Sequence, residues 1–220
     1  MSEASSVAIL GGTGKEGQAL ALRFASRGRP VILGSRDAEK GRRVAEEIHS
    51  RLGGGLVTGA TNAEAARLGR AIVSTLPYGA HVETASELRE ALAGKLVVTA
   101  TIRWPPALDG KPSAAEELAG VLGETARVAA AFQTVSAGSL RNLDSVERED
   151  VLVFAELPAT RQEAVALVAD TGLRGVQAGN LSQTRVAEAL TGMLLGINKL
   201  YGVRSTGIRI TGLPAFEVEE

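Results

Sequence analysis

The 220-residue chain contains no cysteine, few aromatic residues and no long apolar run. The absence of cysteine excludes disulfides, thiolate metal sites, iron–sulfur clusters and a cysteine nucleophile. No apolar run approaches the ~20 residues that a membrane-spanning helix needs, and the opening Met1-Ser2-Glu3 does not have the pattern of a signal peptide. We therefore expect a soluble, cytoplasmic protein with no membrane partner.

Neither sign of charge predominates, because 24 Lys and Arg face 25 Asp and Glu for a net charge of −1. No block of like charge is longer than a few residues, so the sequence indicates no nucleic-acid surface. Aromatic residues make up 3% of the chain against 45% hydrophobic residues in total, which predicts a core of Ala, Val and Leu. The sequence offers no Ser-His-Asp pattern and no metal-binding cluster, so we expect no metal.

The first forty residues have the order that a dinucleotide site requires. An apolar run at 7–10 leads into Gly12-Thr13-Gly14-Lys15-Glu16-Gly17, followed by a helix-like stretch at 18–26 and a second apolar strand at 31–33. Gly12 permits a tight turn, Gly14 lets the backbone approach a pyrophosphate, and Gly17 lets the helix pack closely on the strand. Free N–H groups at the helix start then face the phosphate charge.

The end of the second strand predicts which dinucleotide binds. An NAD site usually places Asp or Glu there to bind the ribose 2′-OH, whereas this chain has Ser35 and Arg36, with Lys40 and Arg43 on the same helix face. A hydroxyl and a group of cations suit a 2′-phosphate, although a basic, solvated helix start is the alternative. Asp37 fits better as the N-cap of the following helix. The cofactor is therefore predicted to be NADP(H).

Strands and helices alternate along most of the chain, which predicts an α/β protein with a Rossmann-like, doubly wound parallel sheet. The expected strands lie at 7–10, 31–33, 56–59, 71–76, 96–100, 128–132 and 150–155. Two further helices are expected at 160–170 and 181–201, separated by a glycine-rich break at 172–179. We thus predict an NADP-binding Rossmann domain at 1–157 and a small, mainly helical C-terminal unit at 158–220.

Short motifs spread over nearly the whole chain resemble the NADPH:coenzyme F420 oxidoreductases, whose second substrate is an 8-hydroxy-5-deazaflavin. Beyond the glycine motif, the segments that carry this resemblance are Gly34-Ser35-Arg36 with Glu39-Lys40, Thr58-Gly59 with Asn62, Ala65 and Ala66, Thr75-Leu76-Pro77-Tyr78, Ser113-Ala114-Ala115-Glu116, Asn142-Leu143-Asp144, Gly172-Leu173-Arg174, Ala178-Gly179-Asn180-Leu181-Ser182 and Arg185-Val186-Ala187-Glu188. The set is much more specific than a lone Rossmann motif.

The resemblance implies hydride transfer between nicotinamide C4 of NADP(H) and C5 of coenzyme F420 as co-substrate, by a homodimer. The two coenzymes carry the chemistry and the protein positions them, so no residue is assigned a certain catalytic role. The implied sites are Thr13, Gly14, Lys15 and Glu16 at the pyrophosphate, Ser35, Arg36 and Lys40 at the 2′-phosphate, Leu76 and Pro77 at the nicotinamide ribose, Gln133, Val135, Ser136 and Ala137 at the hydride-transfer site, and Leu195, Leu200 and Tyr201 over the deazaflavin.

Two departures from the family pattern lie on the substrate side. Gln133 stands where the family usually has His, and Gln does not carry a proton charge near pH 7. The loop at 102–111 also looks shorter than usual. These departures leave open an NADPH-dependent reductase of a flavin, imine or ketone. The absence of any obligatory acid or base leaves open a second alternative, a non-catalytic NADPH-binding sensor.

Overall fold

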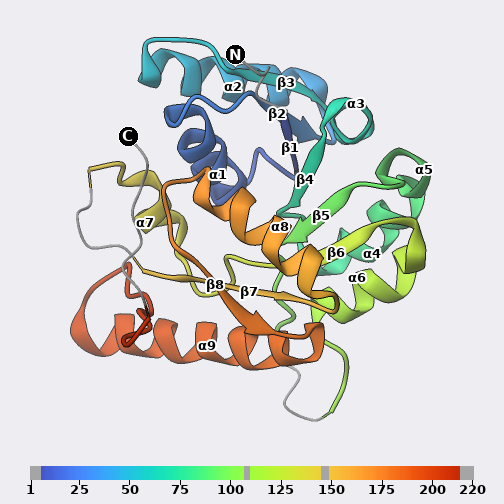
Figure 1. Ribbon diagram of the computed structural model, residues 1–220. Coiled ribbons are helices and arrows are strands. Elements are labelled where there is room, and N and C mark those ends of the chain that lie inside the picture. Colours follow the sequence, from blue (N-terminus) through green and yellow to red (C-terminus); the bar gives the residue numbers. More distant parts are fainter. Residues whose placement is uncertain (1–5, 107–109, 145–148, 214–220) are drawn as a thin grey trace.

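The computed structural model describes residues 6–106, 110–144 and 149–213, and within them eight strands form one sheet (Figure 1). The strands are β1 (Val7–Leu10), β2 (Val31–Ser35), β3 (Val57–Thr61), β4 (Ala71–Ser74), β5 (Leu96–Thr99), β6 (Arg127–Ala130), β7 (Val151–Ala155) and β8 (Gly175–Gly179). They lie in the order β3-β2-β1-β4-β5-β6-β7-β8. The order reverses between β1 and β4, so the carboxyl ends of these two strands mark the expected ligand crevice.

Helices cover both faces of the sheet. They are α1 (Lys15–Ser26), α2 (Ala38–Leu52), α3 (Asn62–Leu68), α4 (Tyr78–Glu87), α5 (Arg89–Leu92), α6 (Ala114–Leu122), α7 (Ala137–Arg141), α8 (Pro158–Ala169) and α9 (Thr184–Tyr201), with short 3₁₀ turns at Gly123–Thr125 and Leu181–Gln183. On β1, Val7 and Ile9 join a core cluster with α1, α2 and α8, whereas Ala8 and Leu10 join a second cluster with α3 and α6. The strand therefore buries both of its faces, as a doubly wound fold requires.

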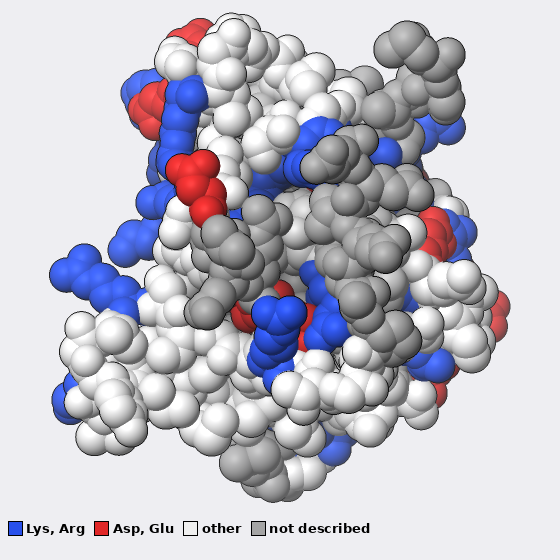
Figure 2. Space-filling model, turned by 60° about the vertical axis from the view of Figure 1, so that its left-hand side comes forward, with Lys and Arg blue, Asp and Glu red and all other residues white. Residues whose placement is uncertain are grey.

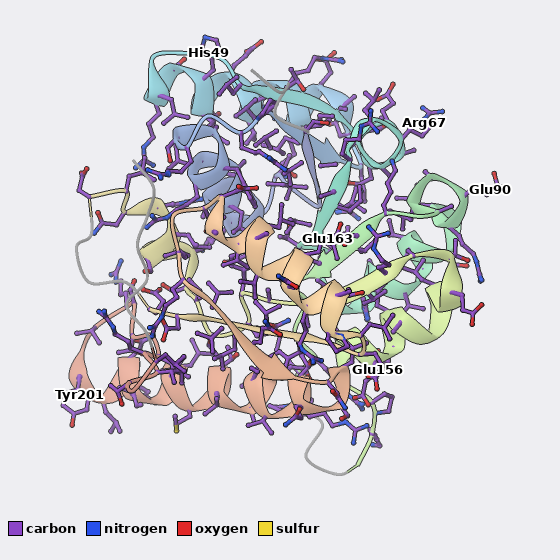
Figure 3. The ribbon with its side chains drawn as sticks, in the orientation of Figure 1. His49, Arg67, Glu90, Glu156, Glu163 and Tyr201 are labelled. Atoms are coloured by element: carbon purple, nitrogen blue, oxygen red, sulfur yellow. The ribbon has the colours of Figure 1, made fainter. Side chains whose placement is uncertain are left out.

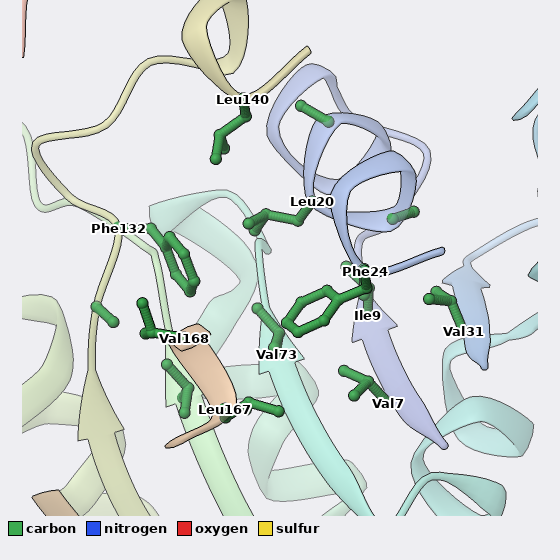
Figure 4. Packing of buried hydrophobic residues seen from close by; sticks show 14 of the residues in the cluster. Val7, Ile9, Leu20, Phe24, Val31, Val73, Phe132, Leu140, Leu167 and Val168 are labelled. Carbon is green, nitrogen blue, oxygen red and sulfur yellow. The ribbon is translucent and has the colours of Figure 1, made fainter. Parts of the chain in front are cut away.

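Phe24 of α1 occupies the centre of the first core cluster, where it is fully buried (Figure 4). Figure 4 shows its ring directed towards the side chain of Val73 on β4. Apart from this ring and Phe132, the cluster consists mainly of Ala, Val and Leu, as the low aromatic content predicts.

Local sequence signals fix several helix starts. The Asp37 carboxylate accepts hydrogen bonds from the backbone N–H groups of Glu39 and Lys40 at 2.9 and 3.3 Å, which confirms the predicted N-cap of α2. Thr61 and Ser113 begin α3 and α6 with capping boxes.

The C-terminal third differs from the sequence prediction in two respects. The predicted glycine-rich break at 172–179 is wrong over Gly175–Gly179, which form β8 and pair in parallel with β7. A Cβ on Gly175 would lie 3.2 Å from the Cα of Val165, so the small residue lets α8 pack closely on this strand.

β7 pairs antiparallel with β6, so the sheet is mostly parallel and not wholly parallel. Division into two domains at Leu157-Pro158, where α8 begins, stays a prediction.

None of the described helices is both long enough and apolar enough to cross a bilayer.

Candidate functional site: a dinucleotide cleft and an adjoining cavity

The glycine loop between β1 and α1 is held in place by backbone hydrogen bonds. Gly12 donates to the Gly34 carbonyl at 2.8 Å, and Gly11, whose φ is +70°, donates to Oδ1 of Asn62 at 3.1 Å. Gly14 is the N-cap of α1, and no side chain in the described part of the protein caps this helix. The N–H groups of the first turn are thus available to an anion such as a pyrophosphate.

Two glycines of this loop have separable roles. A Cβ on Gly17 would lie 2.5 Å from the Cα of Gly12, whereas a Cβ on Gly14 would meet nothing closer than the Gly11 carbonyl oxygen at 3.4 Å. Gly17 therefore permits the packing of α1 on the loop, and Gly14 leaves open the space in front of it.

We expect Gly17→Ala to lower the free energy of unfolding by about 1–3 kcal/mol, because backbone atoms must shift to admit the methyl group. Gly14→Ala should leave the melting temperature almost unchanged and weaken NADPH binding. Thermal melts and nucleotide titrations of both variants check this. Equal destabilisation by the two substitutions would contradict the separation of roles.

A cleft of about 320 Å³ lies at the carboxyl ends of β1, β2 and β4. Its lining residues are Gly11, Thr13, Gly14, Ser35, Arg36, Asp37, Lys40, Asn62, Thr75, Leu76, Pro77, Ala80 and Thr84. Ser35 is buried and its Oγ accepts a hydrogen bond from the Asp37 N–H at 3.2 Å, while Arg36 and Lys40 are exposed. The structure thus brings Ser35, Arg36 and Lys40 together, but Arg43 does not line the cleft.

A second cavity of about 320 Å³ adjoins the first and shares Thr75, Leu76 and Pro77 with it. The other lining residues are Glu16, Tyr78, Ala100, Thr101, Ile102, Phe132, Gln133, Thr134, Val135, Ser136, Thr191, Leu194, Leu195, Asn198 and Thr206. An elongated ligand can therefore have one end at Arg36 and the other at Gln133, with Leu76 and Pro77 between them.

Gln133 has a fixed orientation at the end of β6. The side chain is 3% exposed, and its Nε2 donates to the Thr99 carbonyl at 2.9 Å. Its Oε1 is buried with no hydrogen-bond partner among the described residues. The preceding Phe132 has φ +75°, a left-handed conformation that costs a non-glycine residue roughly 1–3 kcal/mol and is typical of functional sites. The wall of the cavity therefore includes a residue with a buried, unsatisfied acceptor, a feature that needs an explanation in a native structure.

Among the described residues, two titratable groups line this second cavity. Burial raises the pKa of Glu16 to about 8, although the positive charge of Arg141 lowers it in part. Desolvation raises the pKa of Tyr78, as does the 2.9 Å hydrogen bond that its hydroxyl donates to Glu117. The Tyr78 ring stacks on the buried imidazole of His81, with 5.1 Å between ring centroids.

The remaining predicted residues fall in different places. Lys15 and Ala137 line neither of these cavities, and Ala137 begins α7 against the first core cluster. Leu195 lines the second cavity, but Leu200 and Tyr201 do not and are 82% and 78% exposed. Figure 3 shows Tyr201 pointing outwards at the end of α9. The loop predicted to be short, at 102–111, includes residues 107–109, which lie outside the described residues.

Many of the lining residues were not predicted as site residues from the sequence, among them the polar residues Asn62, Thr101, Asn198 and Thr206. Asn62 directly follows β3, and Thr101 lies two residues after the end of β5. Positions just after parallel strands are typical of ligand sites in such a sheet. Asn198 and Thr206 come from α9 and the segment after it, and no local pattern marks them. Asn198 Oδ1 accepts from the Thr206 N–H at 3.0 Å, which fixes that segment beside the cavity.

A doubly wound sheet, a glycine loop at its switch point and a basic group at the end of β2 together define an NADP-binding Rossmann protein. Comparison with known proteins narrows the class. The model of the family described as NADP oxidoreductase, coenzyme F420-dependent, matches residues 6–103. F420-dependent NADP reductases from Methanothermobacter thermautotrophicus and Methanocaldococcus jannaschii are both 36% identical, the first over 96% of this chain and 97% of its own, the second over 94% and 98%. The chain belongs to the family of F420-dependent NADP reductases.

A solved structure shows the same fold. It is a provisionally assigned F420-dependent NADP reductase from Arthrobacter sp. FB24, 21% identical, with a TM-score of 0.78 over 93% of this chain and 98% of the other. The Rossmann-like fold predicted from the sequence is thereby confirmed.

Proposed function

We infer that the protein is an oxidoreductase that transfers a hydride between NADP(H) and the deazaflavin coenzyme F420. Full-length membership of the F420-dependent NADP reductase family carries this inference. Two adjoining cavities that share the Thr75-Leu76-Pro77 segment support it, because hydride transfer requires two rings in contact. The bound coenzymes supply the redox chemistry, and the protein supplies binding and orientation.

The residues of the first cleft fit NADP(H). The uncapped first turn of α1 would hold the pyrophosphate, and Ser35, Arg36 and Lys40 would hold the 2′-phosphate. Neither Arg36 nor Lys40 forms an ion pair within the described part of the chain, so both remain available to a ligand.

The second cavity fits a flat, hydrogen-bonding ring system. Leu76, Pro77, Val135 and Leu194 would provide apolar contact on its faces, and the unpaired Oε1 of Gln133 would accept a hydrogen bond from a ring N–H. Because Gln does not titrate, its role here is orientation rather than proton transfer.

The activity is tested by mixing the purified protein with NADPH and coenzyme F420 and following the deazaflavin's visible absorbance. We expect an enzyme-dependent loss of this absorbance, and a Gln133→His variant that still turns over with altered rate or affinity. Riboflavin, FMN, imines and ketones serve as alternative acceptors. Turnover of one of these in place of coenzyme F420 would overturn the proposed acceptor, and tight NADPH binding with no turnover of any acceptor would support a sensor.

We also propose a homodimer formed through α9. Val186, Leu190, Met193, Ile197 and Leu200 recur at spacings of three and four residues, which places them on one helix face. Val186, Met193 and Leu200 are 57%, 52% and 82% exposed. The lower part of Figure 2, where α9 runs, is largely without charged side chains. Such an exposed apolar stripe suits a second copy of the chain, and sedimentation equilibrium at micromolar concentration tests whether the protein is a dimer.

A cytoplasmic location stays a prediction from the sequence.

A further inference from the structure

Glu16 differs from the rest of the glycine loop in where its side chain lies. The residue is the second of α1, next to the proposed pyrophosphate site, yet it lines the second cavity and not the first. Its Oε1 is buried and has no hydrogen-bond partner among the described residues. An ionised carboxylate with one oxygen buried in this way would lack a donor at that oxygen, which favours the neutral acid.

The charged and titratable groups around Glu16 do not neutralise it. Arg141 of α7 acts on it only through space, since its guanidinium donates to Oε1 of Gln18 at 3.2 Å. Tyr78 is the other titratable group in the cavity lining, and its hydroxyl is bonded to Glu117. Lys15 is exposed and lines neither cavity. The segments from β4, β6 and α9 contribute no charged side chain to the lining.

The two forms of the nicotinamide ring differ in the property that this carboxyl would detect. The oxidised ring carries a positive charge and the reduced ring is neutral, while the rest of the dinucleotide is the same. An opposite charge about 4–6 Å away lowers the pKa of a carboxyl by about 1–3 units. Burial raises the pKa of Glu16 to about 8, so a decrease of this size would bring the pKa to neutral pH or below it.

We propose that Glu16 holds a proton in the free protein and with the reduced nicotinamide, and releases it to solvent when the oxidised, cationic ring binds. Only the Glu16 O–H bond breaks, and no electron moves in this step. The inference rests on the proposed function, because it requires the nicotinamide end of NADP(H) to extend from the first cleft past Leu76 and Pro77 into the second cavity, beside the deazaflavin ring. Glu16 thereby becomes a residue that discriminates between the two redox forms of the cofactor.

The direction in which pH changes the affinity for NADP⁺ follows from the linkage between proton release and binding. At a pH between the two pKa values of Glu16, the lower one in the complex with NADP⁺ and the higher one in the free protein, binding of NADP⁺ releases a proton. The affinity for NADP⁺ therefore rises about tenfold per pH unit in this range. This rise ends near pH 8, where free Glu16 is itself ionised. NADPH affinity shows no such rise.

Isothermal titration calorimetry near pH 7, in buffers of different ionisation enthalpy, measures the protons released on binding. We expect wild type to release about 0.4 to 0.9 more protons per site with NADP⁺ than with NADPH, as a pKa lowered by about 1–3 units from about 8 predicts. The 2′-phosphate is common to both nucleotides and cancels in this difference. Glu16→Gln should abolish the difference, and Glu90→Gln, a matched change at an exposed site on α5, should preserve it.

The outcomes separate this inference from the proposed function. Binding of both nucleotides with equal proton release by wild type, or a difference that persists in Glu16→Gln, overturns the role of Glu16 and leaves the reductase proposal intact. Failure of wild type to bind either nucleotide overturns both. Should Glu16→Gln not fold, the pH dependence of NADP⁺ affinity in wild type between pH 6.5 and 8 decides, since a flat profile contradicts the proposal.

Discussion

Replacing Arg36 with Ala is expected to weaken NADPH binding by about 30- to 150-fold and to leave NADH binding nearly unchanged. Arg36 lies at the carboxyl end of β2 in the dinucleotide cleft, beside Ser35 and Lys40. A guanidinium can form two charge-assisted hydrogen bonds to a phosphate, each contributing more than a neutral bond, and both are lost in the variant. NADH carries no 2′-phosphate, so the same substitution removes nothing from its complex.

Arg43→Ala is the matched control for this measurement. Arg43 lies on α2, the helix that follows Arg36, and is exposed, but it does not line the cleft. Fluorescence titrations with both nucleotides should therefore show wild-type preference for NADPH in Arg43→Ala and its loss in Arg36→Ala. Equal weakening of NADPH and NADH by Arg36→Ala would show that the residue supports the loop structure instead of the 2′-phosphate.

The first half of the fold follows from short-range signals in the sequence. The glycine motif, the Asp37 cap and the apolar strands each act within a few residues, so their structural outcome is independent of the distant chain. The position of Ser35 and Arg36 at the end of β2 is of the same kind. One end of the candidate site can therefore be predicted from the sequence alone.

The later elements depend on packing that the sequence does not display. β8 has the sequence Gly-Val-Gln-Ala-Gly, in which a three-residue alternation is flanked by glycines and is too short to predict a strand. It forms a strand because it pairs with β7 and packs against α8. Glu16 belongs by motif to the pyrophosphate loop, but the direction of its side chain into the second cavity depends on how α1 sits against the β4–α4 connection. Asn198 and Thr206 reach that cavity only through the packing of α9 and the segment that follows it.

The segment after α9 is tied to the sheet by a buried ion pair. Asp150, which precedes β7 and is 2% exposed, accepts hydrogen bonds from Nε and Nη2 of Arg174 at 2.7 and 2.5 Å. It also accepts from the Ile210 N–H at 2.6 Å, and its own N–H donates to the Ile208 carbonyl at 2.7 Å. One carboxylate therefore joins β7, the start of β8 and the segment that carries Thr206.

We expect Asp150→Ala to lower the free energy of unfolding by about 3–5 kcal/mol, because it breaks a buried ion pair and also removes the hydrogen bond that the carboxylate accepts from the Ile210 N–H. Glu163→Ala is the control, since it removes a carboxylate that also binds an arginine, Arg127, with two hydrogen bonds but is about half exposed. That exposed pair should contribute at most about 1 kcal/mol. Urea denaturation of the three proteins measures the contrast, and similar losses in both variants would contradict it.

The same carboxylate gives the protein a specific sensitivity to acid. Desolvation alone would raise the pKa of Asp150, but the hydrogen bonds from Arg174 and Ile210 outweigh it and hold the pKa below its usual value. The stabilisation is therefore complete above the pKa of Asp in the unfolded chain, ~4, and is lost as the pH falls through the lower pKa of the folded protein. The stability difference between wild type and Asp150→Asn should be constant near neutrality and shrink below about pH 4. A difference that stays constant into acid would show that the charge of Asp150 contributes nothing and that its hydrogen bonds alone anchor the segment.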